Sequence, residues 1–218
     1  MIPSIRNHLL LANVLEPSLY SADELEYSTI HQLQVVFKHL RYSAKKFYNP
    51  SSFMRVFGVE HNIQQDACEY FLLLCEKYEQ AVFELQQKRQ KANIGSNDDV
   101  VDIFKSSFGG KLCNQMFVAP SGVSDVNDPA VSARIDASMK EHGVREQDEA
   151  FNIISLDVKS CGNMRNSLQQ FIKYEVIADY EWKENEPRVN IVKRQCISTW
   201  AKTIMFHLKR FELNFDTF

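Results

Sequence analysis

The sequence has 218 residues, and its 25 lysines and arginines against 28 aspartates and glutamates give a formal net charge of −3. This near balance disfavours nucleic-acid binding through bulk charge. Hydrophobic residues make up 44% of the chain and the mean hydropathy is −0.32, values that disfavour both a disordered chain and a membrane span. With only 7 glycines and 6 prolines, the composition favours a helix-rich or mixed fold over a turn-dense sandwich.

The cysteines and the N-terminus indicate the compartment. The first fifteen residues lack the apolar core and the cleavage site of a signal peptide. The cysteines are scattered and contain no C-x-x-C pair, which disfavours a disulfide framework and a self-contained zinc site. We therefore expect reduced thiols in a cytoplasmic or nuclear protein. The five are Cys68, Cys75, Cys113, Cys161 and Cys196.

The N-terminal half is predicted to be helical. Ser28 is a candidate N-cap for an amphipathic helix that reaches Leu40. Pro50 is expected at the first position of a short helix that Gly58 ends. The clearest helix runs from Gln64 to about Lys91, because apolar residues recur there in steps of three and four. They are Ala67, Tyr70, Phe71, Leu74, Tyr78, Ala81, Val82 and Leu85.

A polar break at 93–99 predicts a boundary between a helical part, 1–92, and a β-rich part, 100–218. Residues 108–112 resemble a turn that enters a strand, and 119–149 is so polar that we expect a long, mobile insertion within about 117–150. The alternation of Ile154, Leu156 and Val158 predicts a half-buried strand. Ser167 fits an S-x-x-Q capping box. A β-rich run follows at 203–215, with a bend expected near Lys209.

The most informative polar cluster stands where the long helix begins. Asp66 and Glu69 are three residues apart and so project from the same side. Acidic residues in a first turn offset the helix dipole, and aspartate can cap the helix. The same pair of carboxylates could also bind a cationic ligand such as an arginine.

Other chemistry is weakly supported. Cys68 and Cys75 lie seven residues apart inside the long helix and flank its apolar face, so we expect both to be core thiols. The six histidines show no metal-ligand spacing. The sequence contains no phosphate-binding loop and no G-x-S-x-G motif.

Several segments, in order, resemble one family. Residues 64–70, Q-Q-D-A-C-E-Y, resemble the Q-Q-D-A-x-E-F/Y motif of the ubiquitin-specific proteases, papain-like cysteine deubiquitinases. Similar pieces are L-Q-x-x-F at 33–37, F-x-x-I-x-L-x-V at 151–158, S-L-x-x-F at 167–171 and H-L-K-R-F at 207–211. The resemblance implies an α+β, papain-like cysteine protease fold of thumb, fingers and palm type, here incomplete. Residues 1–92 would be the remaining helical thumb, and 100–218 the fingers and part of the palm.

The resemblance also implies a function. Family members remove ubiquitin from protein conjugates, with a cysteine thiolate as nucleophile and a histidine as base. Gln65, Asp66 and Glu69 would then bind ubiquitin, with the two carboxylates holding the arginines of its C-terminal tail. Ubiquitin and ubiquitinated proteins are the expected partners, and neither nucleic acid nor a membrane is expected.

Some family features are absent from this sequence. The boxes that carry the nucleophilic cysteine and the base would lie before Met1 and after Phe218, so we assign no catalytic residue and expect this chain alone to be inactive. Cys113 stands alone near the first C-x-x-C position of the family's zinc knuckle, and 180–185 replaces the second. We therefore expect no metal and no cofactor.

Two other functional hypotheses stay open at this point. The chain could belong to an inactive pseudoenzyme or scaffold that binds ubiquitin through the same surface. It could also be an unrelated helical interaction module. Charge reversal at Asp66 and Glu69 separates the last hypothesis from the others, because it should weaken ubiquitin binding only if the resemblance holds.

Overall fold

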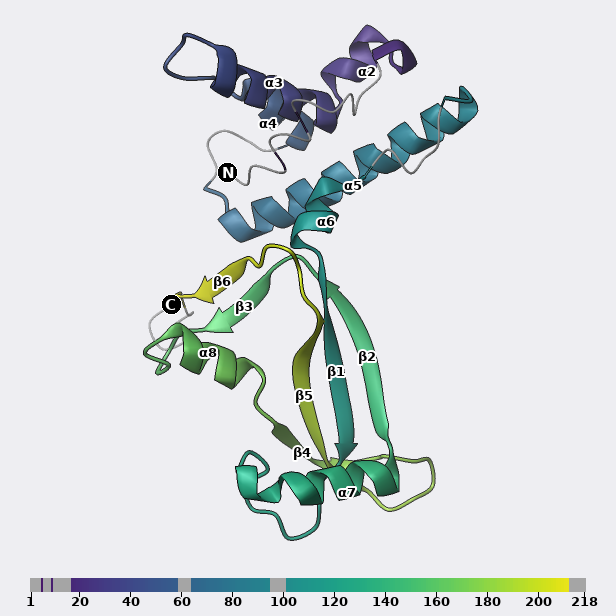
Figure 1. The fold of residues 1–218 in the computed structure, drawn as a ribbon, viewed down its shortest axis with the longest axis vertical. Coiled ribbons are helices and arrows are strands. Elements are labelled where there is room, and N and C mark those ends of the chain that lie inside the picture. The colour runs from purple at the N-terminus through teal and green to yellow at the C-terminus, as the bar shows by residue number, and fades with distance from the viewer. Residues whose placement is uncertain (1–4, 6–8, 10–16, 59–63, 95–100, 212–218) are drawn as a thin grey trace. The chain divides into compact units, whose positions relative to one another are not determined.

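The computed structural model describes residues 5, 9, 17–58, 64–94 and 101–211, and the chain forms two compact units, Met1–Ser107 and Phe108–Phe218 (Figure 1). We call the first the helical unit and the second the sheet unit. Most of the polar break expected to be the boundary, residues 95–100, lies outside the described residues. The division between the units comes about ten residues later, between Ser107 and Phe108.

Short helices and one long helix make up the helical unit, and their ends follow local capping rules. The Ser28 hydroxyl accepts a hydrogen bond from the His31 amide at 3.4 Å, as the sequence predicts. Gly58 ends α4 with a φ of +67°, a left-handed conformation that glycine adopts without strain. Pro50 stands one position before the helix instead of at its first residue. The elements are η1 (Pro17–Leu19), α2 (Ala22–Glu26), α3 (Thr29–Tyr42), α4 (Ser51–Phe57), α5 (Ala67–Lys91) and α6 (Ile103–Phe108).

Helix α5 is 25 residues long and supplies much of the core of the helical unit. Tyr78 is fully buried, and its ring packs edge-on against Phe104 of α6 with the ring centroids 4.9 Å apart. Cys75 is buried as expected, whereas Cys68 is only half-buried and so differs from the prediction. Cys68 lies in the first turn of α5, among the exposed residues Asp66, Ala67 and Glu69. The buried residues of α5 are Cys75, Tyr78, Val82, Leu85 and Arg89.

The sheet unit is built on a four-stranded antiparallel sheet with strand order β2-β1-β5-β4. A separate parallel pair, β3 and β6, lies beside it with α8, and α7 packs against β1 (Figure 1). The strands are β1 (Gly110–Val118), β2 (Val144–Phe151), β3 (Ile154–Asp157), β4 (Glu175–Tyr180), β5 (Val189–Thr199) and β6 (Phe206–Lys209). The helices are η3 (Pro129–Val131), α7 (Ser132–His142) and α8 (Met164–Phe171).

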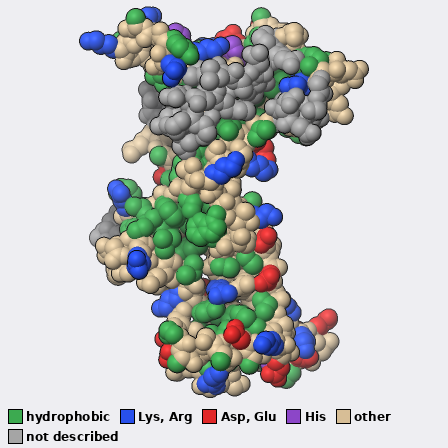
Figure 2. Space-filling view, viewed as in Figure 1, with side chains coloured by type: hydrophobic (Ala, Val, Ile, Leu, Met, Phe, Trp, Pro, Cys, Tyr) green, Lys and Arg blue, Asp and Glu red, His purple; other side chains and the backbone are tan. Residues whose placement is uncertain are grey.

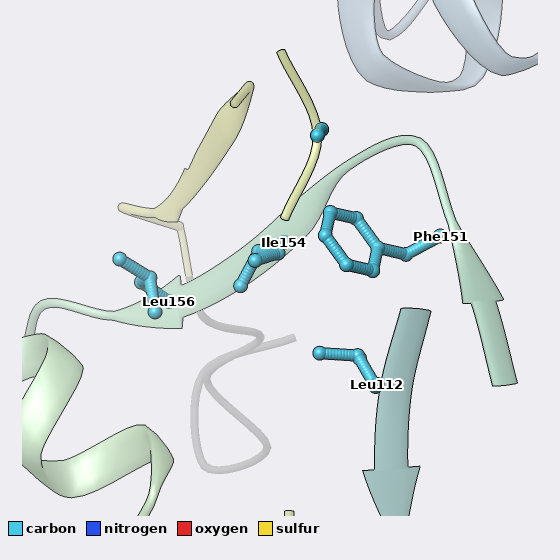
Figure 3. Packing of buried hydrophobic residues seen from close by; sticks show 5 residues of the cluster. Leu112, Phe151, Ile154 and Leu156 are labelled. Carbon is cyan, nitrogen blue, oxygen red and sulfur yellow. The ribbon is translucent and has the colours of Figure 1, made fainter. Parts of the chain in front are cut away.

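Among the described residues of the sheet unit, three apolar clusters hold it together. In the first, Leu112, Phe151, Ile154 and Leu156 converge from β1, β2 and β3 (Figure 3). The predicted strand at 154–158 is confirmed, because its residues alternate between buried and exposed over Ile154–Asp157. The second cluster joins the sheet to α7 and contains Phe117, Val126, Ile135 and Val192. The third contains Val118, Trp182 and Ile191.

The polar segment expected to be a mobile insertion contains regular structure instead. Its apolar residues are few, but Val126 and Ile135 are both buried against the sheet and anchor η3 and α7. Strand β2 is exposed at every residue except Phe151 and pairs with β1 along its whole length. An edge strand exposed on both faces shows no apolar alternation, which is why the sequence did not predict it.

The capping box expected at Ser167 is also wrong. Helix α8 begins earlier, and Asn163 is its N-cap, accepting a hydrogen bond from the Asn166 amide at 3.0 Å. Ser167 lies buried inside the helix, and its hydroxyl donates to the Asn163 carbonyl at 3.4 Å. Such back-bonding to the preceding turn is common for serine in helices.

Strand β6 ends at Lys209, where a bend is expected, and residues 212–218 of the predicted β-rich run lie outside the described residues. In the sheet unit, hydrophobic side chains gather over β3 and β6, and charged side chains of both signs surround α7 (Figure 2). None of the described helices combines the length and the apolar character needed to cross a membrane.

Candidate functional site

The polar cluster predicted from the sequence lies at the N-terminus of α5. Asp66 is the N-cap: its Oδ1 accepts hydrogen bonds from the backbone amides of Cys68 and Glu69, at 2.7 and 3.0 Å. These are two of the donors that the first turn of a helix leaves without a partner. The capping role considered from the sequence is therefore present, and it fixes the orientation of the carboxylate.

Aromatic packing holds this first turn in place on α4. The Tyr70 ring stacks on Phe57 with centroids 5.4 Å apart, and its hydroxyl donates to the Met54 sulfur at 3.6 Å. Burial raises the pKa of Tyr70. Phe57 in turn packs against Phe53 within α4, at 4.5 Å. The end of α5 that carries the cluster is thus anchored by its inner face, and its outer face is left to solvent.

Gln65, Asp66 and Glu69 are all exposed, and the hydrogen bond from the Glu69 amide to Asp66 keeps the two acidic residues adjacent. This arrangement presents two carboxylates from one side of a rigid helix end. The planar guanidinium group of arginine, with five N–H donors, matches such carboxylates well. The geometry therefore suits a cationic ligand better than an anionic one.

Cys68, Cys75 and Cys113 lack the environment of a catalytic nucleophile. Burial, and then the Asp66 carboxylate, raise the pKa of Cys68. Burial raises the pKa of Cys75 to about 12 and is also the main cause of the raised pKa of Cys113. Reactive cysteines need the opposite shift, toward the thiolate. His207 belongs to β6, where its Nδ1 lies 3.4 Å from the Ser155 hydroxyl of β3.

The part of the sheet unit where the resemblance would place a zinc knuckle is packed with side chains. Trp182, in the segment 180–185, is buried against Val118 and Ile191. The guanidinium group of Arg145 lies 4.1 Å from the centre of its indole ring and donates to the Trp182 carbonyl. Within the described residues, no three His, Cys, Asp or Glu side chains come together as metal ligands.

Comparison with known proteins relates the chain and its fold to one class. No family model matches the chain. Ubiquitin carboxyl-terminal hydrolase 24 from Mus musculus is 27% identical over 216 residues, which cover 93% of this chain and 7% of that protein. The human protein of the same name matches to the same extent. Probable ubiquitin carboxyl-terminal hydrolase FAF from Drosophila melanogaster is 25% identical over 196 residues, which cover 86% of this chain and 6% of that protein.

A solved structure supports the same class at the level of the fold. The SAGA DUB module, which contains Ubp8, Sgf11, Sus1 and Sgf73, matches with a TM-score of 0.64 and 18% identity. The match covers 96% of this chain and 43% of the solved chain. The α+β fold predicted from the sequence is thus the fold of part of a deubiquitinase module. The chain is a distant relative of the ubiquitin-specific proteases and spans about 7% of the length of the first curated relatives it matches.

Proposed function

We propose that this chain is the part of a ubiquitin-specific cysteine protease that contributes to ubiquitin binding during removal of ubiquitin from protein conjugates. In this proposal the helical unit is part of the thumb, and the sheet unit forms the fingers and part of the palm. The ordered sequence motifs and the likeness to ubiquitin carboxyl-terminal hydrolases over 93% of the chain support it. The observation that carries the proposal is the exposed, capped cluster of Gln65, Asp66 and Glu69.

The cluster would bind the basic C-terminal tail of ubiquitin. Two amide donors orient the Asp66 carboxylate, and Glu69 lies in the first turn of the same helix. Because Tyr70 and Phe57 anchor that turn, its backbone needs little further ordering on binding, which favours affinity. Gln65 adds an amide that can both donate and accept hydrogen bonds beside the tail.

Binding of ubiquitin to the purified chain tests this proposal. Asp66→Asn keeps the capping oxygen but removes the charge, since asparagine caps helices about as well as aspartate. Glu69→Gln removes the second charge at nearly constant size. Charge-assisted hydrogen bonds contribute about 1.5–3 kcal/mol each, so the double variant should bind ubiquitin at least about tenfold more weakly, measured by titration calorimetry.

Glu76 provides the matched control. It is exposed on the same helix, seven residues after Glu69 and so on the same side, two turns away from the cluster. Glu76→Gln changes the charge of the chain as Glu69→Gln does and should leave the affinity unchanged. Ubiquitin without its C-terminal tail should bind the unmodified chain and the double variant equally. Equal affinity of the double variant and the unmodified chain for intact ubiquitin would contradict the proposed role.

A further inference from the structure

Two cysteines far apart in the sequence face each other across the sheet. Cys113 on β1 is directly paired with Cys196 on β5, although 83 residues separate them. Directly opposed residues of antiparallel strands project from the same face of a sheet. Both thiols are free in this structure. The two side chains therefore form a dithiol on one face of the two central strands.

The spacing of this pair suits a covalent bond between the sulfurs. Opposed residues on antiparallel strands have Cα atoms about 4.5 or 5.5 Å apart, depending on the type of pair. Both values fall within the roughly 4.4–6.8 Å over which disulfides form. The Cys196 thiol donates to the Cys113 carbonyl oxygen at 3.6 Å, which holds its sulfur beside Cys113.

The two thiols differ in accessibility. Cys113 is 7% exposed and is flanked on its other side by Asp148 of β2, the residue paired with it there. Burial, followed by the Glu146 carboxylate, raises the pKa of Cys113, so this thiol stays protonated near neutral pH. Cys196 is half-buried. A small oxidant would thus reach Cys196 first and find Cys113 beside it.

We propose that Cys113 and Cys196 form a redox-sensitive pair that closes into a cross-strand disulfide when the protein meets a hydroperoxide. In the first step the Cys196 thiolate attacks a peroxide oxygen, the O–O bond breaks, and a sulfenic acid forms with release of water or an alcohol. In the second step the Cys113 sulfur attacks the sulfenic sulfur, and water leaves with the Cys113 proton. The dithiol loses two electrons and two protons, and the peroxide is reduced.

The other three cysteines lack this geometry. Cys68 and Cys75 are seven residues apart on α5, where a rise of 1.5 Å per residue separates them by about 10 Å. That distance exceeds what a disulfide spans. Cys161 lies in the turn before α8 and belongs to neither β1 nor β5, so it has no partner in the β1–β5 register. Selectivity for one pair among five cysteines is thus a consequence of strand register.

Mass spectrometry of the whole chain tests the proposal. The reduced protein, freed of reductant, is treated near neutral pH with a slight excess of hydrogen peroxide, quenched, denatured and alkylated with iodoacetamide. The untreated chain should take up five alkyl groups, one for each cysteine. The treated chain should take up three, and its digest should contain a peptide in which Cys113 is linked to Cys196. Reduction before alkylation should restore five.

Variants and denaturant supply the controls. Cys196→Ser and Cys113→Ser should each abolish the loss of two alkylation sites, whereas Cys161→Ser should preserve it. The same oxidation in concentrated urea should give mixed linkages, because the strand register is then absent. Uptake of five groups after oxidation of the folded chain would overturn the proposal, as would an oxygen adduct on Cys196 without a crosslink, or a linkage between any other pair. None of these readouts depends on ubiquitin binding.

Discussion

At the residue scale, Asp66 combines two roles that the sequence left as alternatives. Its Oδ1 accepts hydrogen bonds from the Cys68 and Glu69 amides, which stabilise the start of α5. Capping uses an oxygen of the side chain, and the negative charge remains at the exposed end of the helix. The two roles are therefore compatible. Substitutions can distinguish them, because capping needs a side-chain oxygen and binding of a cationic ligand needs the negative charge.

We expect Asp66→Ala to lower the free energy of unfolding by about 1 kcal/mol, the usual loss when an N-cap is removed. Asp66→Asn should cost much less, since its amide oxygen can accept the same two hydrogen bonds. Urea unfolding followed by the circular dichroism of the helices measures both. If Asp66→Asn destabilised the protein as much as Asp66→Ala, the carboxylate would stabilise α5 by its charge and not by its hydrogen bonds.

Residue types that cap helices are visible in a sequence, but their positions are less certain. Ser28 is the N-cap of α3 as predicted, because it immediately precedes a strong apolar period. Helix α5 is expected from Gln64 but begins at Ala67, and Asp66, which the sequence offers as a cap only as an alternative, is its N-cap. Ser167 matched a capping box and yet lies inside α8, which Asn163 starts one turn earlier. The apolar side of that short helix does not show where it begins, so no local signal in the sequence favours Asn163 over Ser167 as the cap.

At the element scale, the start of β1 depends on a glycine. A Cβ on Gly110 would lie 2.4 Å from the ring of Phe151 and 2.7 Å from the Thr199 carbonyl oxygen. These contacts come from the two strands that flank β1, and they are closer than real Cβ atoms approach their neighbours. The first residue of β1 therefore has no room for a side chain.

We expect Gly110→Ala to destabilise the sheet unit by about 1–3 kcal/mol, a range typical of an overpacked site. Both tryptophans, Trp182 and Trp200, belong to this unit, so a shift of the fluorescence-detected urea transition measures the effect. Phe151→Leu in the same background should recover part of the loss, since it removes the ring but leaves the Thr199 carbonyl. A transition at the midpoint of the unmodified protein would contradict the predicted clash.

Strand β2 shows why the secondary structure of a polar segment is hard to predict from its sequence. The sequence of β2, V-R-E-Q-D-E-A-F, carries charges on both faces, which is unfavourable for a buried strand and suitable for an edge. Its side chains also pair across the strands: Gln115 donates to Glu146 at 2.5 Å, and Asn114 donates to Glu149 at 3.2 Å. These partners come from β1, which the sequence of β2 alone does not reveal.

At the scale of the whole molecule, two compact units carry the α+β character that the resemblance implies. The helical unit contains the proposed ubiquitin-tail cluster, and the sheet unit contains the Cys113–Cys196 pair. The ordered motifs predicted the likeness to ubiquitin-specific proteases, and the comparisons confirm it at the level of distant relatives and of the fold.

We expect the 218-residue chain to bind ubiquitin without cleaving it. The pKa values of Cys68, Cys75 and Cys113 are raised, so these thiols are protonated near neutral pH and poorly nucleophilic. Incubation with ubiquitin–rhodamine should release no fluorescence above background, with an active deubiquitinase as the positive control. Turnover that thiol alkylation abolishes would show that one of the cysteines is an active nucleophile.

The sequence by itself determined the features that depend on near neighbours. The period of α5, the proximity of Asp66 and Glu69 and the alternation of β3 all arise from contacts within a few residues, so pattern and spacing reveal them. Tertiary structure decided the partners across the sheet: Cys113 with Cys196, β2 with β1, and Arg145 over Trp182. Strand register brings together residues tens of positions apart, and no local period encodes which distant strand will supply the partner.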